Sequence, residues 1–326
     1  MHLSKYLPLL LALTIALSCG CASRPSDAKA QPAVRRSMSS TTEPAVRRSL
    51  AAPVRAQWKT TATAGSRLAT LDGVTIWMSQ PATGNPAKPS AIDMKTFFDP
   101  VLSGRTSPLA RGRQQRIMLD PGHGGHDPGA ISGSLRESVI TLDIATKTAE
   151  LLRKAGYQVQ LTRTGDDFID LERRDTLAAQ WKADLFVSIH LNSAASAGAA
   201  GIETYFIPPV TMRTTQQSAG GPPYEEPLWM QKNYPGNAHP EENMRLAFCV
   251  HRRTGAAAQL TDRGIKTARF AVLRSATMPA ILVECGFISN SNNAALLAAP
   301  EGRDRIARGI ASGIQDFAQG AIAPTR

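Results

Sequence analysis

From residue 116 onward, short apolar runs alternate with longer segments whose apolar positions recur every three or four residues. The short runs have the length of β-strands, and the longer segments have the period of amphipathic helices. The segment 137–156, for example, places Ile140 and Ile144 on one helical face and ends at Gly156, a typical residue at a helix C-terminus. We predict strands at 116–120, 157–163, 184–190, 202–207, 270–274 and 280–285, and helices at 137–156, 171–183, 243–260 and 304–318.

Strands that alternate with helices are typical of an α/β fold. We expect a mainly parallel twisted sheet with helices on both faces, forming a single catalytic domain over residues 113–320. A signal and a disordered tether are expected to precede this domain.

The N-terminus has the pattern of an export signal. A short basic region is followed by the apolar run Leu9–Leu17, which is too short to span a bilayer comfortably. The small residues that end at Cys21 resemble a bacterial lipoprotein signal, so we expect a signal peptide at residues 1–21 with lipid on Cys21. Lipid on Cys19 and ordinary cleavage near Ala22 are the alternatives.

Residues 22–62 are rich in Ala, Pro, Ser, Thr and Arg, and PAVRRS occurs twice in them. With almost no large apolar residues, this stretch is expected to be a disordered tether. Residues 1–67 carry +8 of the formal net charge of +11. A basic tail before a near-neutral body favours attraction to membrane headgroups or an acidic wall polymer and matches no nucleic-acid-binding module. We expect an exported, periplasmic protein with membrane attachment.

Two segments have less regular patterns. Residues 63–112 are expected to form a small accessory segment on the main domain. Residues 208–241 are polar and rich in Pro and Gly. This segment is long for a loop in a compact domain. This loop is interpreted as a lid, an inhibitory plug, a substrate-length selector or a solvated loop. Within it, Glu225, Glu226 and His239 are candidates for blocking a metal.

Polar, proton-handling side chains lie where the predicted strands end. RIMLD opens into His123, DLFVSIH ends on His190, AILVEC carries Glu284, and Glu137 begins the first helix. Open α/β sheets place their sites at this edge. Two imidazoles and a carboxylate around an open position form a frequent catalytic zinc set, and a second carboxylate can serve as general base.

Each of these residues also has a structural interpretation. His123 fits an exposed turn, His190 a hydrogen-bonded core histidine, and Glu137 a favourable acid at a helix N-terminus. Glu284 fits a structural role least well, because a carboxylate in a buried strand is costly unless it is paired or functional. A phosphate-binding loop is excluded, since GHGGHDPG contains neither GxGxxG nor GxxxxGK[ST].

The thiols outside the signal region are Cys249 and Cys285. An exported location permits a disulfide between them. Alternatively, Cys285 is a buried and inert thiol beside Glu284.

Several blocks resemble, in order, those of the zinc-dependent N-acetylmuramoyl-L-alanine amidases, a bacterial cell-wall amidase family. The resemblance covers residues 115–318 and rests on LDPGHGGHDPGA, the glutamate that opens the first helix, LTRTGDDFIDLERRDTLAAQ, ADLFVSIHLNS, GIETYF and PAILVECGFISN.

The resemblance implies that His123, Glu137 and His190 bind Zn²⁺ and that Glu284 is the catalytic acid/base. His126 occupies a variable place in the motif, so it is not expected to be a ligand. Zinc would polarise the scissile carbonyl and lower the pKa of its water, whose proton Glu284 would pass to the leaving amine.

Four neighbouring residues have open roles. Asp120 is interpreted either as orienting a ligand histidine or as a turn former before Pro. Asn192 either contacts substrate or caps the following loop. Arg163 and Arg174 are expected to be structural ion-pair partners.

We therefore predict an amidase that hydrolyses the bond between MurNAc and L-Ala in peptidoglycan, in wall remodelling or turnover. A zinc peptidase or carboxypeptidase that cuts within the stem peptide is the enzymatic alternative. A peptidoglycan-binding protein without catalysis is the other. The sequence identifies no activator protein.

Overall fold

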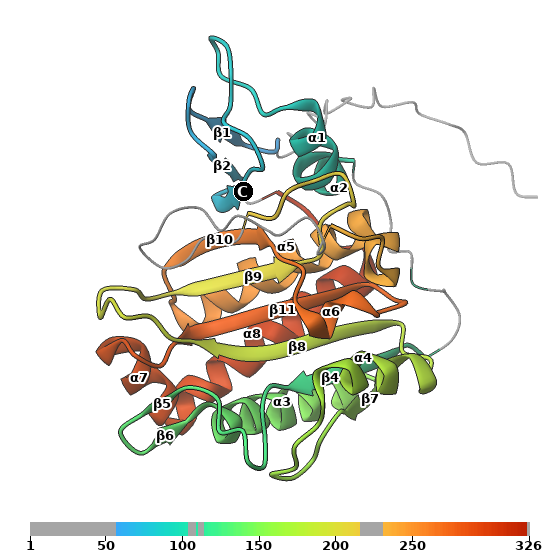
Figure 1. Cartoon of the computed structure of the whole chain (residues 1–326), viewed down its shortest axis with the longest axis vertical. Helices are drawn as coiled ribbons and strands as arrows, with labels where there is room; N and C mark the ends of the chain where they lie inside the picture. The colour runs from blue at the N-terminus through green and yellow to red at the C-terminus, as the bar shows by residue number, and fades with distance from the viewer. Residues whose placement is uncertain (1–56, 104–108, 110–113, 216–230, 325–326) are drawn as a thin grey trace, which may run out of the picture. The chain divides into compact units, whose positions relative to one another are not determined.

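The computed structural model describes residues 57–103, 109, 114–215 and 231–324. Nine strands of these residues form one sheet in the order β1-β2-β3-β10-β9-β11-β8-β4-β7 (Figure 1). The strands, in chain order, are β1 (Thr60–Ala62), β2 (Leu68–Leu71), β3 (Val74–Trp77), β4 (Arg116–Pro121), β7 (Gln158–Leu161), β8 (Leu185–Asn192), β9 (Ile202–Phe206), β10 (Asp262–Thr267) and β11 (Ala280–Phe287). A separate hairpin pairs β5 (Ile131–Ser132) with β6 (Leu135–Arg136).

The sheet is mainly parallel, as predicted. Strands β7, β4, β8 and β11 run in one direction, and β9 pairs antiparallel with β11. Strands β10 and β3 then follow the direction of β9. This reversal brings the first residues of β9 and β10 to the edge at which β8 and β11 end. Side chains from the C-terminal ends of β8 and β11 and from the N-terminal ends of β9 and β10 therefore lie at the same edge of the sheet.

Helices cover both faces of the sheet, which confirms the predicted fold class. On one face α8 (Pro300–Gln319) packs on α3 (Glu137–Lys154) and α5 (Pro240–Ala258), and on the other α4 (Leu171–Gln180) packs on α6 (Ala271–Arg274). Successive apolar side chains of a strand point to opposite faces. In β8, Leu185 and Val187 accordingly enter the α3/α5/α8 core, whereas Phe186 enters the α4/α6 core.

Several elements differ from the sequence prediction. FAVLR, predicted as a strand, contains helix α6, because a short apolar run does not distinguish a buried strand from a helical turn. Strand β10 was not predicted, since DRGIKT is largely polar; its Arg263 and Lys266 are paired with Glu203 in the sheet. Helix α7 (Ser291–Ala298) was also missed, although Asn290 caps its N-terminus.

The N-terminal segment contributes to the main sheet. β1 to β3 form an antiparallel meander, and β3 pairs with β10. β1 lies inside the range 22–62 predicted to be a tether, so that boundary was set too late; its three residues are ordered by pairing with β2. A helical segment follows, formed by α1 (Ala91–Asp93), η1 (Met94–Phe98) and α2 (Asp99–Leu102).

The predicted signal, with Cys19 and Cys21, lies outside the described residues, as do residues 22–56 and Glu225 and Glu226 of the long loop. Within the described part of the chain, no helix is both long and apolar enough to cross a membrane.

Asp175 of α4 links this helix to the segment after α6 and generates a prediction about pH. It is fully buried, and its Oδ2 accepts a hydrogen bond of 3.0 Å from the Ser275 backbone. Burial, aided by the charge of Asp120, raises the pKa of Asp175 to about 6.

The folded protein therefore holds this proton more tightly than the unfolded chain does. Asp175 should lower the free energy of unfolding as pH rises from about 4 to about 6. In Asp175→Asn that loss should be absent, so the variant should gain about 2 kcal/mol relative to wild type over this range. Denaturant titrations at several pH values, with the exposed Asp170→Asn as control, measure the difference; parallel pH curves for Asp175→Asn and wild type would contradict it.

Candidate metal centre

The turn after β4 places His123 beside the end of β8. His123 has a positive φ of 61°, which is uncommon for a residue with a side chain and is associated with functional sites. Glycines make room around it. A Cβ on Gly122 would overlap the His190 ring, and one on Gly129 would lie 2.6 Å from Cδ2 of His123. The glycines of GHGGHDPG thus allow the turn to approach both imidazoles.

Glu137, the first residue of α3, lies between the two histidines. Its Oε1 is 3.1 Å from Nε2 of His123 and 3.0 Å from Nδ1 of His190. The same oxygen accepts a hydrogen bond from the Leu191 backbone, and Oε2 accepts one from the Ala130 backbone. The helix N-terminus favours the charged carboxylate at this position. Glu137 therefore joins β8, α3 and the β4 turn.

Together, His123, Glu137 and His190 present ligand atoms that all lie within 4.8 Å of one another. The histidine side chains are 25% and 14% exposed, whereas the Glu137 side chain is 4% exposed. Two imidazole nitrogens and one carboxylate are the donor set of many catalytic zinc sites. The cluster thus fits a zinc ion that remains accessible from solvent.

The electrostatics of the cluster follow from burial and charge. Burial opposes the ionised form of Glu137, but the contacts with both histidines outweigh it and hold the pKa of Glu137 well below its usual range. Burial also disfavours charge on His123, yet Glu137 and Asp127 raise the pKa of His123 overall. Without a metal, the carboxylate thus favours a proton on the His123 imidazole, where a metal cation would otherwise bind.

Glu284 lies one strand from this cluster. In the parallel pair of β11 and β8, Glu284 is directly opposite His190. Glu284 as a whole is half-buried, but its Oε2 atom is buried and has no hydrogen-bond partner. Burial raises the pKa of Glu284 well above its usual value, and the negative charge of Glu137 raises it further. An unpaired buried carboxyl group of this kind is typical of a proton-transfer residue.

Asp127, which the sequence prediction overlooked, contacts a histidine of the cluster. Its Oδ2 lies 2.7 Å from Nδ1 of His123, so it orients the ring that Nε2 extends toward Glu137. The sequence feature that could have identified Asp127 is its position four residues after His123 in the same turn. Asp120 does not orient a histidine, because its carboxylate is bound by Thr162, Arg174 and Ser188.

His126 is not part of the cluster. It is exposed, and its ring lies against Phe168 at a centroid distance of 4.1 Å.

Two buried arginines support the turn that carries His123. Arg174 forms an ion pair of 2.9 Å with Asp120 and donates to the backbone oxygen of His123. Arg163 donates to the backbone oxygens of Pro121, Gly122, Gly165 and Ser138. The structural role expected for both holds; Arg174 acts through an ion pair and Arg163 through its hydrogen bonds to backbone oxygens.

A second charged group lies on the other side of Glu284 and was not identified from the sequence. Glu203, at the start of β9, is directly opposite Glu284 and binds Lys266 and Arg263 of β10. The argument used for Glu284, a carboxylate inside an apolar run, applies equally to IETYF and would have found Glu203. The two cations were missed together with β10.

The remaining candidates have structural partners. Asn192 donates to Oε2 of Glu203 at 3.0 Å, and His239 contacts the backbone oxygen of Thr277. Cys249 and Cys285 are both buried and free, so the permitted disulfide is not formed.

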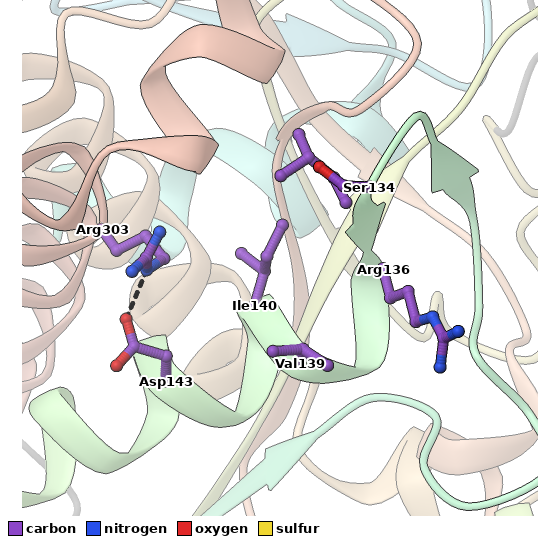
Figure 2. Close-up of a pocket in the computed structure, with 7 residues that line it drawn as sticks. Ser134, Arg136, Val139, Ile140, Asp143 and Arg303 are labelled. Carbon is purple, nitrogen blue, oxygen red and sulfur yellow. Dashed lines mark hydrogen bonds and ion pairs between the residues drawn. The ribbon is translucent and has the colours of Figure 1, made fainter.

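A pocket of about 610 Å³ lies against the first turns of α3. Figure 2 shows Val139 and Ile140 projecting from α3 toward it, with the ion pair of Asp143 and Arg303 to one side. Arg136, which also lines it, immediately precedes Glu137. None of the described residues that line this pocket belongs to the metal cluster.

The family model described as N-acetylmuramoyl-L-alanine amidase matches residues 117–316. The chain belongs to the N-acetylmuramoyl-L-alanine amidase family.

Proteins named as amidases are similar to this chain in sequence, and solved amidase structures are similar to it in fold. A sporulation-specific N-acetylmuramoyl-L-alanine amidase of Bacillus subtilis is 35% identical over 202 residues, which cover 61% of this chain and 67% of the relative. The catalytic domain of CwlV, an amidase from Bacillus (Paenibacillus) polymyxa, is 33% identical with a TM-score of 0.51, over 63% of this chain and 98% of that domain. AmiC2 of Nostoc punctiforme is 31% identical with a TM-score of 0.52, over 63% and 97% of the two chains. The family resemblance predicted from the motifs is confirmed. β1 to β3 lie outside the family match.

The buried Arg174–Asp120 pair generates a prediction for the amidase. Arg174→Met removes the cation and leaves a buried carboxylate, which should lower the free energy of unfolding by about 3–5 kcal/mol. The substitution also removes the hydrogen bond that Arg174 donates to the backbone oxygen of His123, so zinc affinity should fall. Denaturant unfolding and zinc titration check both effects. The neighbouring exposed residue supplies the control, Arg173→Met. Equal stability of the two variants would contradict a supporting role for the pair.

Proposed function

We propose that this amidase hydrolyses the amide between MurNAc and L-Ala of peptidoglycan with a zinc ion held by His123, Glu137 and His190. The observation that carries the proposal is the convergence of these three side chains beside the unpaired buried oxygen of Glu284, in a chain of this family. Peptidoglycan is the substrate class that the family implies.

The two imidazoles and the Glu137 carboxylate would hold the metal. Glu137 would supply the charged ligand, and Asp127 would fix the ring of His123 so that its Nε2 remains free for the metal. When bound, Zn²⁺ acts as a Lewis acid on the scissile carbonyl and lowers the pKa of the attacking water.

Glu284 would move the proton. As a carboxylate opposite His190, it takes a proton from the attacking water and returns it to the nitrogen of the departing L-Ala. Its raised pKa makes the Glu284 carboxylate a better acceptor of the proton of the attacking water. The C–N bond breaks as the amine leaves protonated.

The metal set alone also suits a zinc peptidase that cuts within the stem, so the family membership carries the choice of scissile bond. A protein that only binds the wall has no chemical need for an acid/base such as Glu284. That residue therefore favours an enzyme over a binding protein.

We further propose that the chain is exported and attached to the membrane through lipidated Cys21, with the basic segment adding attraction to anionic surfaces. The short apolar run Leu9–Leu17 and the small residues before Cys21 support this. Mass spectrometry of the mature N-terminus tests it. Lipid on Cys21 is expected, and a mature chain that begins without lipid near Ala22 would contradict it.

Glu284→Gln tests the assigned acid/base. The substitution keeps the size of the side chain and removes its basicity, so release of stem peptide should fall by about 10²–10⁴-fold. Bound zinc, measured by elemental analysis, should remain at the wild-type level. Glu301→Gln, on the exposed start of α8, is the control. Substantial residual hydrolysis by Glu284→Gln would remove Glu284 from this role.

Removal of single ligands tests the metal set. His123→Ala and His190→Ala should each bind less zinc, because each loses one of three protein ligands. His126→Ala, only three residues from His123, should retain wild-type zinc and activity. Zinc stoichiometry after dialysis against a weak chelator gives the readout. A histidine whose loss leaves stoichiometric zinc is not a ligand.

A further inference from the structure

A row of charged side chains continues from Glu284 away from the histidines. The row runs from His190 on β8 to Glu284 on β11, Glu203 on β9 and then Arg263 on β10. The first three are direct neighbours in the strand register, so their side chains point to the same face of the sheet. The row therefore links the proposed acid/base to a cationic end.

Glu203 at the centre of this row is fully satisfied. Its Oε1 lies 2.6 Å from Nζ of Lys266 and 2.8 Å from Nε of Arg263. Its Oε2 accepts hydrogen bonds from the Tyr205 hydroxyl and the Asn192 amide. Glu203 is 2% exposed, so these contacts compensate for burial of its charge.

The two cations of the cluster differ in exposure. The Lys266 side chain is 3% exposed and already neutralises Glu203, whereas the Arg263 side chain is 31% exposed. Charge balance of Glu203 therefore does not require Arg263.

Arg263 is held in a defined position and keeps donors available. Its Nε donates to Glu203, and its guanidinium lies over the Phe287 ring at 4.8 Å. Neither Nη group has a hydrogen-bond partner among the described residues. A planar guanidinium with two such donors matches the geometry of a carboxylate.

Arg263 is also within reach of a substrate bound at Glu284. Arg263 donates to the carboxylate of Glu203, which is directly opposite Glu284 in the sheet, so the guanidinium lies within roughly 10 Å of the Glu284 backbone. An extended peptide covers this length in about three residues. The first residues of a stem peptide would therefore lie beside Arg263.

Given the proposed function, we propose that Arg263 binds the free carboxylate of the second stem residue and makes the amidase select stems that carry this charge. Glu203 and Lys266 act as positioning residues that fix the guanidinium without contacting the substrate.

The test uses two soluble muropeptides that differ in one group. The second stem residue is D-isoglutamate, with a free carboxylate, in one and D-isoglutamine, with a neutral amide, in the other. The wild-type enzyme should have a KM about tenfold lower for the isoglutamate substrate, as expected for a hydrogen bond between charged groups. Arg263→Gln should raise that KM about tenfold, leave the isoglutamine KM within about twofold, and leave kcat unchanged.

Arg252→Gln is the matched control, because Arg252 also lies over an aromatic ring, Phe248, and is partly exposed on α5. It should keep the wild-type preference. Arg263→Lys retains the charge but loses the planar pair of donors, so it should retain only part of the preference. Melting temperature and bound zinc, measured for every variant, identify loss of folding; if Arg263→Gln is unfolded, Arg263→Lys decides.

Equal KM values of the wild-type enzyme for the two substrates would overturn this inference and leave the proposed function intact. An Arg263 variant that keeps the wild-type preference, or that loses kcat equally on both substrates, would also overturn it. If the wild-type enzyme cleaves neither substrate at the MurNAc–L-Ala bond, the proposed function fails as well.

Discussion

The buried carboxylate of Glu137 is the constraint on which the site depends. One side chain contacts His123 on the β4 turn, His190 on β8 and the backbone that follows each of them. Its charge is stabilised by the start of α3 and by both imidazoles. Because it is almost fully buried, these contacts must form together, and the sheet edge, the turn and the helix are fixed relative to one another.

The reversal of β9 determines what surrounds this carboxylate. In an all-parallel sheet, only the C-terminal ends of strands would line this edge, but β9 and β10 contribute their N-terminal residues to it. Glu203 thereby lies opposite Glu284, and Arg263 lies beyond Glu203. The neighbouring strand β3 belongs to the segment outside the family match. The ammonium group of Lys266 lies over the ring of Trp77 in β3, and the indole N–H of Trp77 donates a hydrogen bond to the backbone oxygen of Arg263. The extra strands thus support the cationic end of the row.

The sequence was sufficient where a residue's chemistry conflicts with its surroundings. Glu284 stands inside an apolar run, and its unpaired oxygen agrees with the interpretation that it is functional. The apolar runs also predicted the central parallel strands. β10 could not be predicted this way, because Arg263 and Lys266 are stabilised in the sheet by Glu203, a contact between residues 60 or more positions apart. Asp127, and not Asp120, orients His123 because the turn folds back on itself, which strand patterns do not describe.

We propose that a metal-dependent reaction at the sheet edge that carries the metal cluster and Glu284 cuts the bond between the glycan and the stem peptide. The most direct measurement is mass analysis of the products released from purified sacculi by zinc-loaded and by chelator-treated protein. We predict intact stem peptides with a free L-Ala amino group, released only by the zinc-loaded form. Fragments cut within the stem, or equal release after chelation, would contradict it.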